Sequence, residues 1–410
     1  MTTTRRGIGR RIAYWRGRRN LTQEEFGALM GGYSVRWVQD LEAEKRQQDP
    51  RLSVVERAAR VLRIPMKWLI EDSPTVSCVD AVELDAIRLA LHRHDVITGT
   101  ADAASAGPLP IPELRRRWVH GRMAFQAGSF GSLGRVVPEL LVEANRAAAR
   151  YEGDDQRAAL RLLSLTYGLT EAVSVKFGAP DLALIAGHRA VLAAERSEDP
   201  VVMASAARQL ADAMTHQGQA AAGVDFALAV AARLESDLLA RGAAGVSVLG
   251  MLYLKSAMAA AQVDSVPAAR RVPGLLDQAA EHAALLGYDG NHVWTAFGPT
   301  NVLIHRVAAS TALAEGGAAV AVALTIPDSS LADLPRERRA HHLADLAAAY
   351  VQAGRRPEAV DALLRAEREA PEEVRCRPRT RALVDDLRLL GAGAAEGRLR
   401  ALAGRCGLAD

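Results

Sequence analysis

Residues 113–410 alternate long helix-forming segments with short breakers, and this alternation limits the possible folds most strongly. The segments are rich in Ala and Leu and lack the apolar–polar alternation of strands. Successive breakers lie about 38 to 52 residues apart, enough for two helices and their turns. The sequence therefore predicts an all-α array of about six helical hairpins, with a plain helical bundle as the alternative. The breakers are Gly128, Gly178-Ala179, Gln217-Gly218, Asp264-Ser265, Gly316-Gly317 and Gly354-Arg355.

Residues 343–371, LADLAAAYVQAGRRPEAVDALLRAEREAP, show the hairpin pattern most clearly. The small residues Ala347 and Ala359 allow two helices to approach closely, and Pro371 ends the second helix. Apolar residues occupy the other characteristic positions, Leu343, Leu346, Tyr350, Leu363 and Ala366. The segment resembles a tetratricopeptide (TPR) repeat. That resemblance implies a TPR-like solenoid, with residues 377–406 as its terminal cap.

The first 70 residues follow a different pattern. Residues 21–46 read as two short helices joined by a turn at residues 31–33, with Thr22 and Ser34 as helix N-caps. Apolar residues at helical spacing predict further helices near 7–19, near 52–62 and after Pro65. Two helices joined in this way form a helix-turn-helix, whose second helix fits the major groove of DNA.

Five short helices in this order resemble the Cro/C1-type repressor domain of the XRE family, over residues 7–72. The chain departs from the family pattern in two places: the turn is one residue longer, and Glu44 stands where the family often has Gly. The resemblance implies that Glu42 faces inward and forms a salt bridge with Arg16. The residues that carry it are Arg16, residues 21–25, Gly31, Val38, Glu42 and residues 65–69.

Candidate base contacts lie along the second helix of this motif. Arg36 is suited to bidentate pairing with guanine, and Val35 to contact with a thymine methyl group. Trp37 is large for a groove-facing position and is expected to wedge against the sugar–phosphate backbone. Asp40 stands at a base-contact position of the family and would favour a cytosine amino group. Gln39 is a further candidate.

Candidate phosphate contacts flank the recognition helix. Gln23 stands at a helix N-terminus, where free amides and the helix dipole favour a phosphate. In the family pattern this Gln contacts the DNA backbone. Lys45, Arg46 and the arm Arg5-Arg6 are expected to add affinity without sequence choice. The charge distribution agrees, since residues 1–73 hold 15 Lys and Arg against 9 Asp and Glu, whereas the remainder is slightly acidic.

Residues 288–305 are unusual, because three aromatic residues and two Asn stand within an Ala- and Leu-rich background. TPR arrays bind ligands on the concave face formed by the first helices of their hairpins. Asn pairs with peptide amides, and aromatic rings cover apolar groups. The alternative is that the aromatic residues fill a core. The residues predicted to contact a ligand are Trp294, Phe297, Asn301, His305 and Tyr253.

The sequence predicts no catalytic residue, cofactor or metal site. The Gly-rich run at residues 128–134 has no preceding strand and no following Lys, so it reads as a hairpin turn rather than a phosphate loop. His341-His342 is expected on a solvated helix start. Glu372-Glu373 is expected on a helical surface without a nearby base. An enzyme is therefore not supported.

The cysteines and the apolar runs favour a cytoplasmic protein. Cys78, Cys376 and Cys406 are far apart and form no metal-binding motif, which fits a reducing compartment. No uninterrupted apolar run is long enough to suggest a membrane span, and the polar, basic N-terminus does not resemble a secretory signal.

These patterns predict three segments: a DNA-binding domain at 1–73, a connecting helix with a linker at 74–112, and a TPR-like domain at 113–410. The expected function is that of a transcriptional regulator that binds double-stranded operator DNA as a homodimer. Its TPR-like domain would bind a small molecule or peptide and change operator affinity. The alternative is a DNA-tethered adaptor whose TPR-like domain recruits a protein partner.

Overall fold

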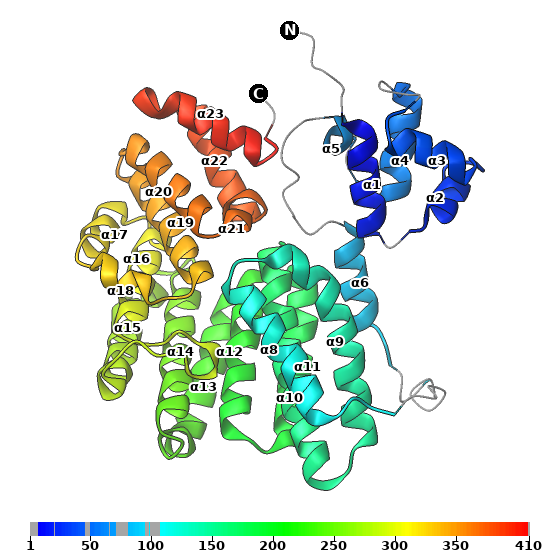
Figure 1. Ribbon diagram of the computed structural model, residues 1–410. Helices are drawn as coiled ribbons and strands as arrows, with labels where there is room; N and C mark the ends of the chain where they lie inside the picture. The colour runs from blue at the N-terminus through cyan, green and yellow to red at the C-terminus, as the bar shows by residue number, and fades with distance from the viewer. Residues whose placement is uncertain are drawn as a thin grey trace. The chain divides into compact units, whose positions relative to one another are not determined.

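The computed structural model describes residues 7–19, 21–45, 50–64, 66–70, 81–94, 98 and 107–408. Every regular element in these residues is a helix, which confirms the predicted all-α class (Figure 1). The chain divides into two compact units. The first comprises residues 1–75 and 80–82, and the second comprises residues 76–79 and 83–410.

The first unit contains five short helices around one apolar core. They are α1 (Ile8–Arg18), α2 (Gln23–Leu29), α3 (Val35–Glu42), α4 (Leu52–Leu62) and α5 (Lys67–Ile70). Trp15, Phe26 and Val38 are almost completely buried in this core. The apolar spacing that predicted each helix thus corresponds to its buried face.

Local hydrogen bonds fix the ends of α2 and α3. Thr22 and Glu25 form a capping box, with the Glu25 amide 3.1 Å from Thr22 Oγ1 and the Thr22 amide 2.7 Å from Glu25 Oε2. The Ser34 hydroxyl accepts from the Trp37 amide at 3.3 Å. Between the helices, Gly31 and Gly32 adopt φ values of 111° and 83°, which side chains disfavour.

Six helical hairpins form most of the second unit, which confirms a helical-repeat architecture. Five of the six predicted breakers lie at the turn between two paired helices, and the sixth, Gly316-Gly317, begins the second helix of its pair. The pairs are α8 (Ile111–Gln126) with α9 (Phe130–Arg150), α10 (Gly153–Lys176) with α11 (Pro180–Ser197), α12 (Pro200–His216) with α13 (Ala220–Leu239), α14 (Ala243–Ala260) with α15 (Val266–Leu286), α16 (Pro299–Ala312) with α17 (Gly316–Ala323), and α19 (Arg336–Gln352) with α20 (Arg356–Glu369).

Shorter helices complete the second unit. The 3-10 helix η1 (His292–Trp294) precedes α16, and α18 (Asp328–Ala332) precedes α19. After the last hairpin come α21 (Pro371–Arg375), α22 (Pro378–Leu390), η2 (Gly393–Ala395) and α23 (Glu396–Arg405). Helix α6 (Ala81–Leu91) buries Ile87 and Leu91 in the core of this unit. The second unit thus begins before residue 113, because α6 packs into it.

Small residues allow the paired helices to pack closely. Ala347 of α19 and Ala359 of α20 are completely buried, as the TPR-like pattern predicts. A Cβ on Gly187 of α11 would lie only 3.1 Å from the Leu210 Cα of α12. Helix α14 is long and apolar enough to cross a membrane, but 67% of its apolar window is buried inside the protein.

Helices at the end of the array contact helices at its beginning. The Gly131 amide of α9 donates to Glu372 Oε2 of α21 at 2.7 Å. On α10, Lys176 forms an ion pair with Glu337 of α19 at 2.6 Å. A Cβ on Gly128 would lie 2.5 Å from the Ala370 Cβ. These contacts close the hairpin array, so the inner faces of its first helices surround a common space.

Candidate functional site

A cavity of about 130 Å³ lies inside the hairpin array. All six first helices line it, which agrees with the ligand-binding face predicted from the repeat pattern. Charged and polar side chains dominate the lining. One representative from each of α8, α10, α12, α14, α16 and α19 is Arg122, Lys176, Arg208, Lys255, His305 and Arg338.

The segment between α15 and α16 forms part of the cavity wall. Arg122 donates through Nη2 to the Trp294 carbonyl at 3.1 Å, and the Trp118 and Trp294 rings meet edge to face. The side-chain amides of Gln126 and Asn291 exchange two hydrogen bonds at 2.9 and 3.1 Å. This segment therefore reaches across to α8, the first helix of the array.

Strained backbone marks the same segment. Val293, Trp294 and Ala296 have φ values of 51°, 60° and 51°, in the left-handed region. A β-branched residue such as Val is a genuine outlier there. Each such residue costs on the order of 1–3 kcal/mol, and strain of this kind clusters at ligand sites. The unusual composition of residues 288–305 thus coincides with an unusual backbone beside the cavity.

The structure separates the five residues predicted to contact a ligand. Trp294 and His305 line the cavity, whereas Phe297 is completely buried in the core against Gly250. Asn301 is also completely buried, and its Nδ2 lies 3.4 Å from the Thr295 carbonyl. Direct ligand contact is therefore wrong for Phe297 and Asn301, because both side chains are completely buried in the protein core next to α14.

Tyr253 also lies away from the cavity. Its ring stacks on His282 of α15 with the centroids 5.4 Å apart. The neighbouring Lys255 does line the cavity, and its Nζ lies 2.8 Å from Asp212 Oδ1. Side chains two residues apart on a helix point about half a turn apart, which explains why Lys255 reaches the cavity and Tyr253 does not.

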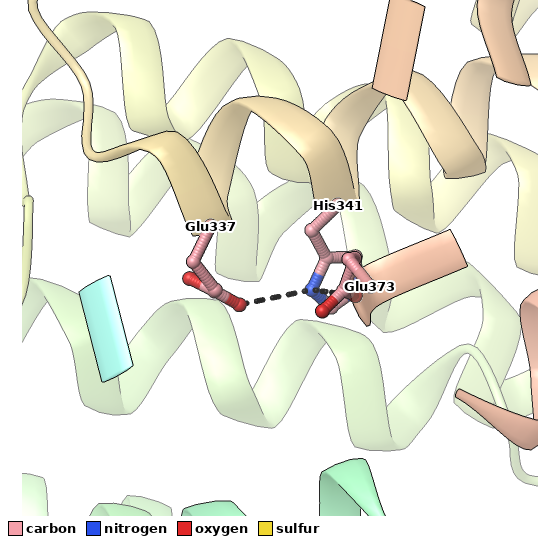
Figure 2. Close-up of side chains that lie close together, drawn as sticks. All are labelled: Glu337, His341 and Glu373. Atoms are coloured by element: carbon pink, nitrogen blue, oxygen red, sulfur yellow. Dashed lines mark ion pairs between the residues drawn. The ribbon is translucent and has the colours of Figure 1, made fainter. Parts of the chain in front are cut away.

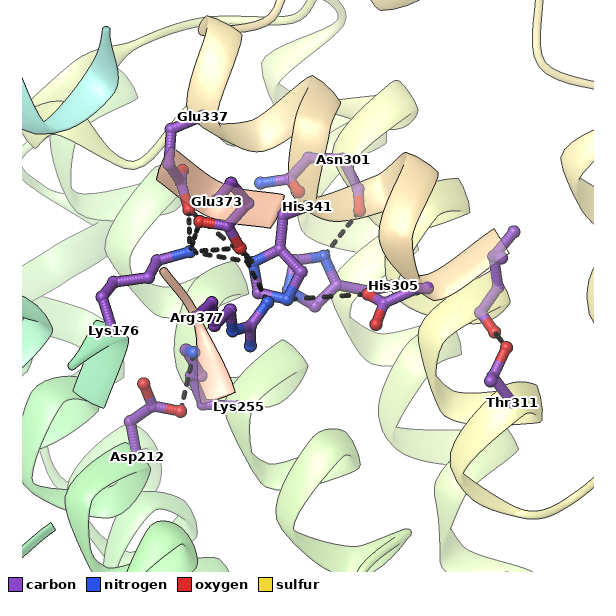
Figure 3. A network of polar contacts seen from close by, with 12 residues as sticks. Lys176, Asp212, Lys255, Asn301, His305, Thr311, Glu337, His341, Glu373 and Arg377 are labelled. Carbon is purple, nitrogen blue, oxygen red and sulfur yellow. Dashed lines mark hydrogen bonds and ion pairs between the residues drawn. The ribbon is translucent and has the colours of Figure 1, made fainter. Parts of the chain in front are cut away.

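A network of buried charges occupies one side of the cavity (Figure 3). The Lys176 ammonium lies 2.6 Å from Glu337 Oε1 and 2.8 Å from Glu373 Oε2, and Arg377 donates to Glu373 at 2.7 Å. Glu373 is completely buried and His342 is 3% exposed. The expectations of solvated positions for His341-His342 and for Glu373 are therefore wrong, because the closed array covers them.

Three members of this network have the donors of a metal site. Ligand atoms of Glu337, His341 and Glu373 lie within 4.8 Å of one another, and Figure 2 shows the side chains converging. However, Lys176 Nζ binds both carboxylates and lies 3.3 Å from His341 Nδ1. The Lys176 ammonium already binds these ligand atoms, so a metal ion would first have to displace Lys176.

Burial disfavours the charged form of three histidines that line the cavity. It lowers the pKa of His305 to about 3 and the pKa of His342 to about 4. The pKa of His341 falls well below its ordinary value, because burial and then Arg377 and Lys176 disfavour its charged form. Glu171 of α10 is completely buried, and burial with nearby Asp212 raises its pKa well above the ordinary value.

In the first unit, the predicted salt bridge between Arg16 and Glu42 is confirmed. Arg16 Nε and Nη2 lie 2.5 and 3.1 Å from the two Glu42 carboxylate oxygens. Gln23 donates to the same carboxylate at 2.9 Å and accepts from Gln39 at 3.2 Å. This chain of hydrogen bonds connects α1, α2 and α3, and it orients Gln23 and Gln39.

The outer face of α3 carries the predicted base contacts. Val35, Arg36 and Gln39 are exposed, and Lys45 beyond the helix is also exposed. Asp40 is partly buried. Trp37 stacks on Tyr33 at 3.9 Å, so the turn holds its ring in place. Three further predicted contacts, Arg5, Arg6 and Arg46, lie outside the described residues.

The sequence interpretation missed the charged residues that line the cavity, including Arg122, Lys176, Arg208 and Arg338. They belong to four helices far apart in the chain and form no motif. The available signal was a charged residue on the otherwise apolar inner face of a first helix. No protein-family model matches the chain. No curated protein matches it either.

Proposed function

We propose that the protein is a transcriptional regulator that binds operator DNA through α3 and an effector through the hairpin array. The observation that carries this proposal is the division of α3 into two faces. Val38 and Leu41 are buried against α1 and α2, whereas Arg36 and Gln39 point to solvent. A helix fixed on one side and polar on the other is suited to the major groove.

Local geometry supports a helix-turn-helix. The capping box at Thr22 fixes the start of α2, and the two glycines of the turn permit the sharp change of direction. Glu44 adopts φ 55°, the left-handed conformation for which the Cro/C1-type family often uses Gly. Glu44 therefore adopts the backbone geometry of the family position, although its residue type differs.

The hairpin array supports an effector site. TPR-like arrays present ligands to the inner faces of their first helices, and all six first helices line the cavity. In this proposal the protein acts in the cytoplasm as a homodimer, because two heads are needed to cover a two-fold operator. It catalyses no reaction.

DNA binding is tested by selecting bound duplexes from a random-sequence pool with the full chain. We expect a consensus to be enriched. Arg36→Ala should weaken cognate binding by about 1–3 kcal/mol and relax one base position. Lys45→Ala should weaken binding to all sequences alike and reduce the salt dependence. Arg60→Ala, on the exposed face of α4, supplies the control.

Two outcomes would contradict the proposal. One is the absence of any enriched sequence. The other is an equal loss of specific and random DNA binding in the Arg36 variant. A stable heteromeric complex that co-purifies while no sequence is enriched would instead support the adaptor.

A further inference from the structure

We propose that the cavity binds a small anionic group, a phosphate or a carboxylate, through Arg122, Arg208 and Arg338. The inference rests on the proposed effector-binding role of the hairpin array, and it assigns the chemical class of the effector. The three arginines come from α8, α12 and α19, and all three line the cavity.

The three guanidinium groups lack anionic partners. Arg122 and Arg208 are each 8% exposed. Within the described residues, no carboxylate lies within 4.0 Å of any of the three, and the buried Nε atom of each has no hydrogen-bond partner. Arg122 donates one hydrogen bond, from Nη2 to the Trp294 carbonyl. Several donors therefore remain available around the cavity.

The nearby carboxylates are already engaged. Asp212 lies one turn after Arg208 on α12, but Lys255 binds it at 2.8 Å. Lys176 binds Glu337 and Glu373, and Arg377 binds Glu373 as well. The three carboxylates of this group are thus paired with its three cations, and none of them forms an ion pair with Arg122, Arg208 or Arg338.

Glu171 forms no ion pair with any of the three arginines. It is completely buried, and neither carboxylate oxygen has a hydrogen-bond partner among the described residues. Burial raises its pKa well above the ordinary value, which disfavours the charged carboxylate. Burial, and then repulsion by Arg208, lowers the pKa of Arg122 to about 10. Arg122 therefore still carries its charge near pH 7.

An unpaired buried cation is costly, and an anion in the cavity would offset that cost for all three arginines together. Guanidinium groups bind phosphate and carboxylate oxygens through short, charge-assisted hydrogen bonds. A cavity of about 130 Å³ is close to the size of one that holds benzene, about 150 Å³. It accommodates a phosphate or a carboxylate with a short stem.

The test measures thermal unfolding of the full chain during titration with inorganic phosphate and, separately, with acetate. Sodium chloride keeps the ionic strength constant. We expect a saturable rise in Tm for the wild type, and the more effective probe identifies the phosphate or the carboxylate class. Arg208→Gln and Arg338→Gln should each weaken the response by at least about tenfold.

Two controls separate this site from general charge effects. Arg115→Gln removes an exposed arginine from α8, the helix that also carries Arg122, and should leave the response unchanged. Arg208→Gln should melt at or above the wild-type temperature without added anion, because it removes an uncompensated buried charge. Arg338 is only partly buried, so Arg338→Gln provides a readout that does not depend on the core.

The inference is overturned if neither anion stabilises the wild type saturably, or if both arginine variants respond as the wild type does. An equal loss in Arg115→Gln would also overturn it. DNA selection is measured independently on the same protein. Loss of DNA selection with an intact anion response rejects the regulator and retains the anion site, and the converse result rejects the anion site alone.

Discussion

At the scale of single residues, the bidentate salt bridge between Arg16 and Glu42 is the most consequential contact of the first unit. Glu42→Ala would leave the Arg16 guanidinium only 17% exposed and without its carboxylate. Removing one partner of a buried pair costs roughly 3–5 kcal/mol. We expect native-state hydrogen exchange in residues 7–45 to accelerate accordingly, as measured by mass spectrometry on the full chain.

The exposed pair of Arg60 and Glu56 supplies a matched control. Its side chains are 74% and 62% exposed, and Glu56→Ala should change stability by less than about 1 kcal/mol. If Glu42→Ala exchanges like the wild type yet loses operator binding, Glu42 contacts DNA and the structural role is wrong.

Phe297 provides the second residue-scale prediction. Its ring fills the space above Gly250 of α14, where a Cβ would lie 2.0 Å from the ring. Phe297→Ala should lower the free energy of unfolding by about 3–5 kcal/mol, because it leaves a cavity in a completely buried core. Urea unfolding measures this loss. Leu285→Ala, which alters a 69% exposed side chain on α15, should change stability by less than about 0.5 kcal/mol.

A variant that unfolds at the wild-type urea concentration would contradict the core role of Phe297. Loss of effector binding without loss of stability would show that Phe297 belongs to the ligand site. The distinction matters because the sequence alone left both roles open for the aromatic residues of this segment.

At the scale of helices, local signals predicted most of the elements. Thr22 and Ser34 predicted two N-caps, and Gly128 and Gly354 predicted hairpin turns, because capping and turn formation depend on a few neighbouring residues. Burial of His342 and Glu373 could not be predicted in this way. It arises from α19 and α21 packing against α8–α10, about 200 residues earlier in the sequence.

The candidate ligand site shows the same limit. The unusual composition of residues 288–305 indicated the cavity wall, and Trp294 and His305 do line the cavity. Phe297 and Asn301 stand in the same segment but face the core. Their orientation depends on how α16 packs on α14, and neither spacing nor residue type specifies that packing.

The inner faces of α16 and α19 also predict a pH dependence of stability. Burial lowers the pKa of His305 to about 3 in the folded state, whereas the unfolded value is about 6.5. Below pH 6.5 the unfolded chain therefore binds a proton that the folded protein excludes. Stability should fall between pH 6.5 and about 4, with a contribution of about 1.4 kcal/mol per pH unit from each buried histidine.

Glu171 acts in the opposite direction. Its raised pKa stabilises the folded state at low pH, and that contribution is lost as pH rises above the ordinary carboxyl value. Above about pH 4.5 it therefore works against the contribution of the histidines. Urea unfolding at pH 7, 6 and 5 measures the net slope. His305→Gln should make the slope shallower by about one proton, whereas His188→Gln, on the exposed face of α11, should not.

At the scale of the whole molecule, the proposed function requires that two binding events influence each other. The anion proposed for the cavity would connect Arg122 of α8, Arg208 of α12 and Arg338 of α19, which belong to the first, third and last hairpins. An anion held by all three favours the closed form of the array. The proposed function requires that this change in closure alters operator affinity.

Linkage sets the quantitative form of this coupling. If phosphate changes operator affinity by some factor, operator DNA must change phosphate affinity by the same factor. We expect a coupling of about 1–3 kcal/mol, measured by titrating operator at several phosphate concentrations and phosphate with and without operator, at constant ionic strength. Arg208→Gln should remove the phosphate dependence while leaving operator binding without phosphate intact. A phosphate dependence that persists in Arg208→Gln would show that phosphate acts at the DNA-binding surface instead, and equal affinities throughout would leave the array without a regulatory role.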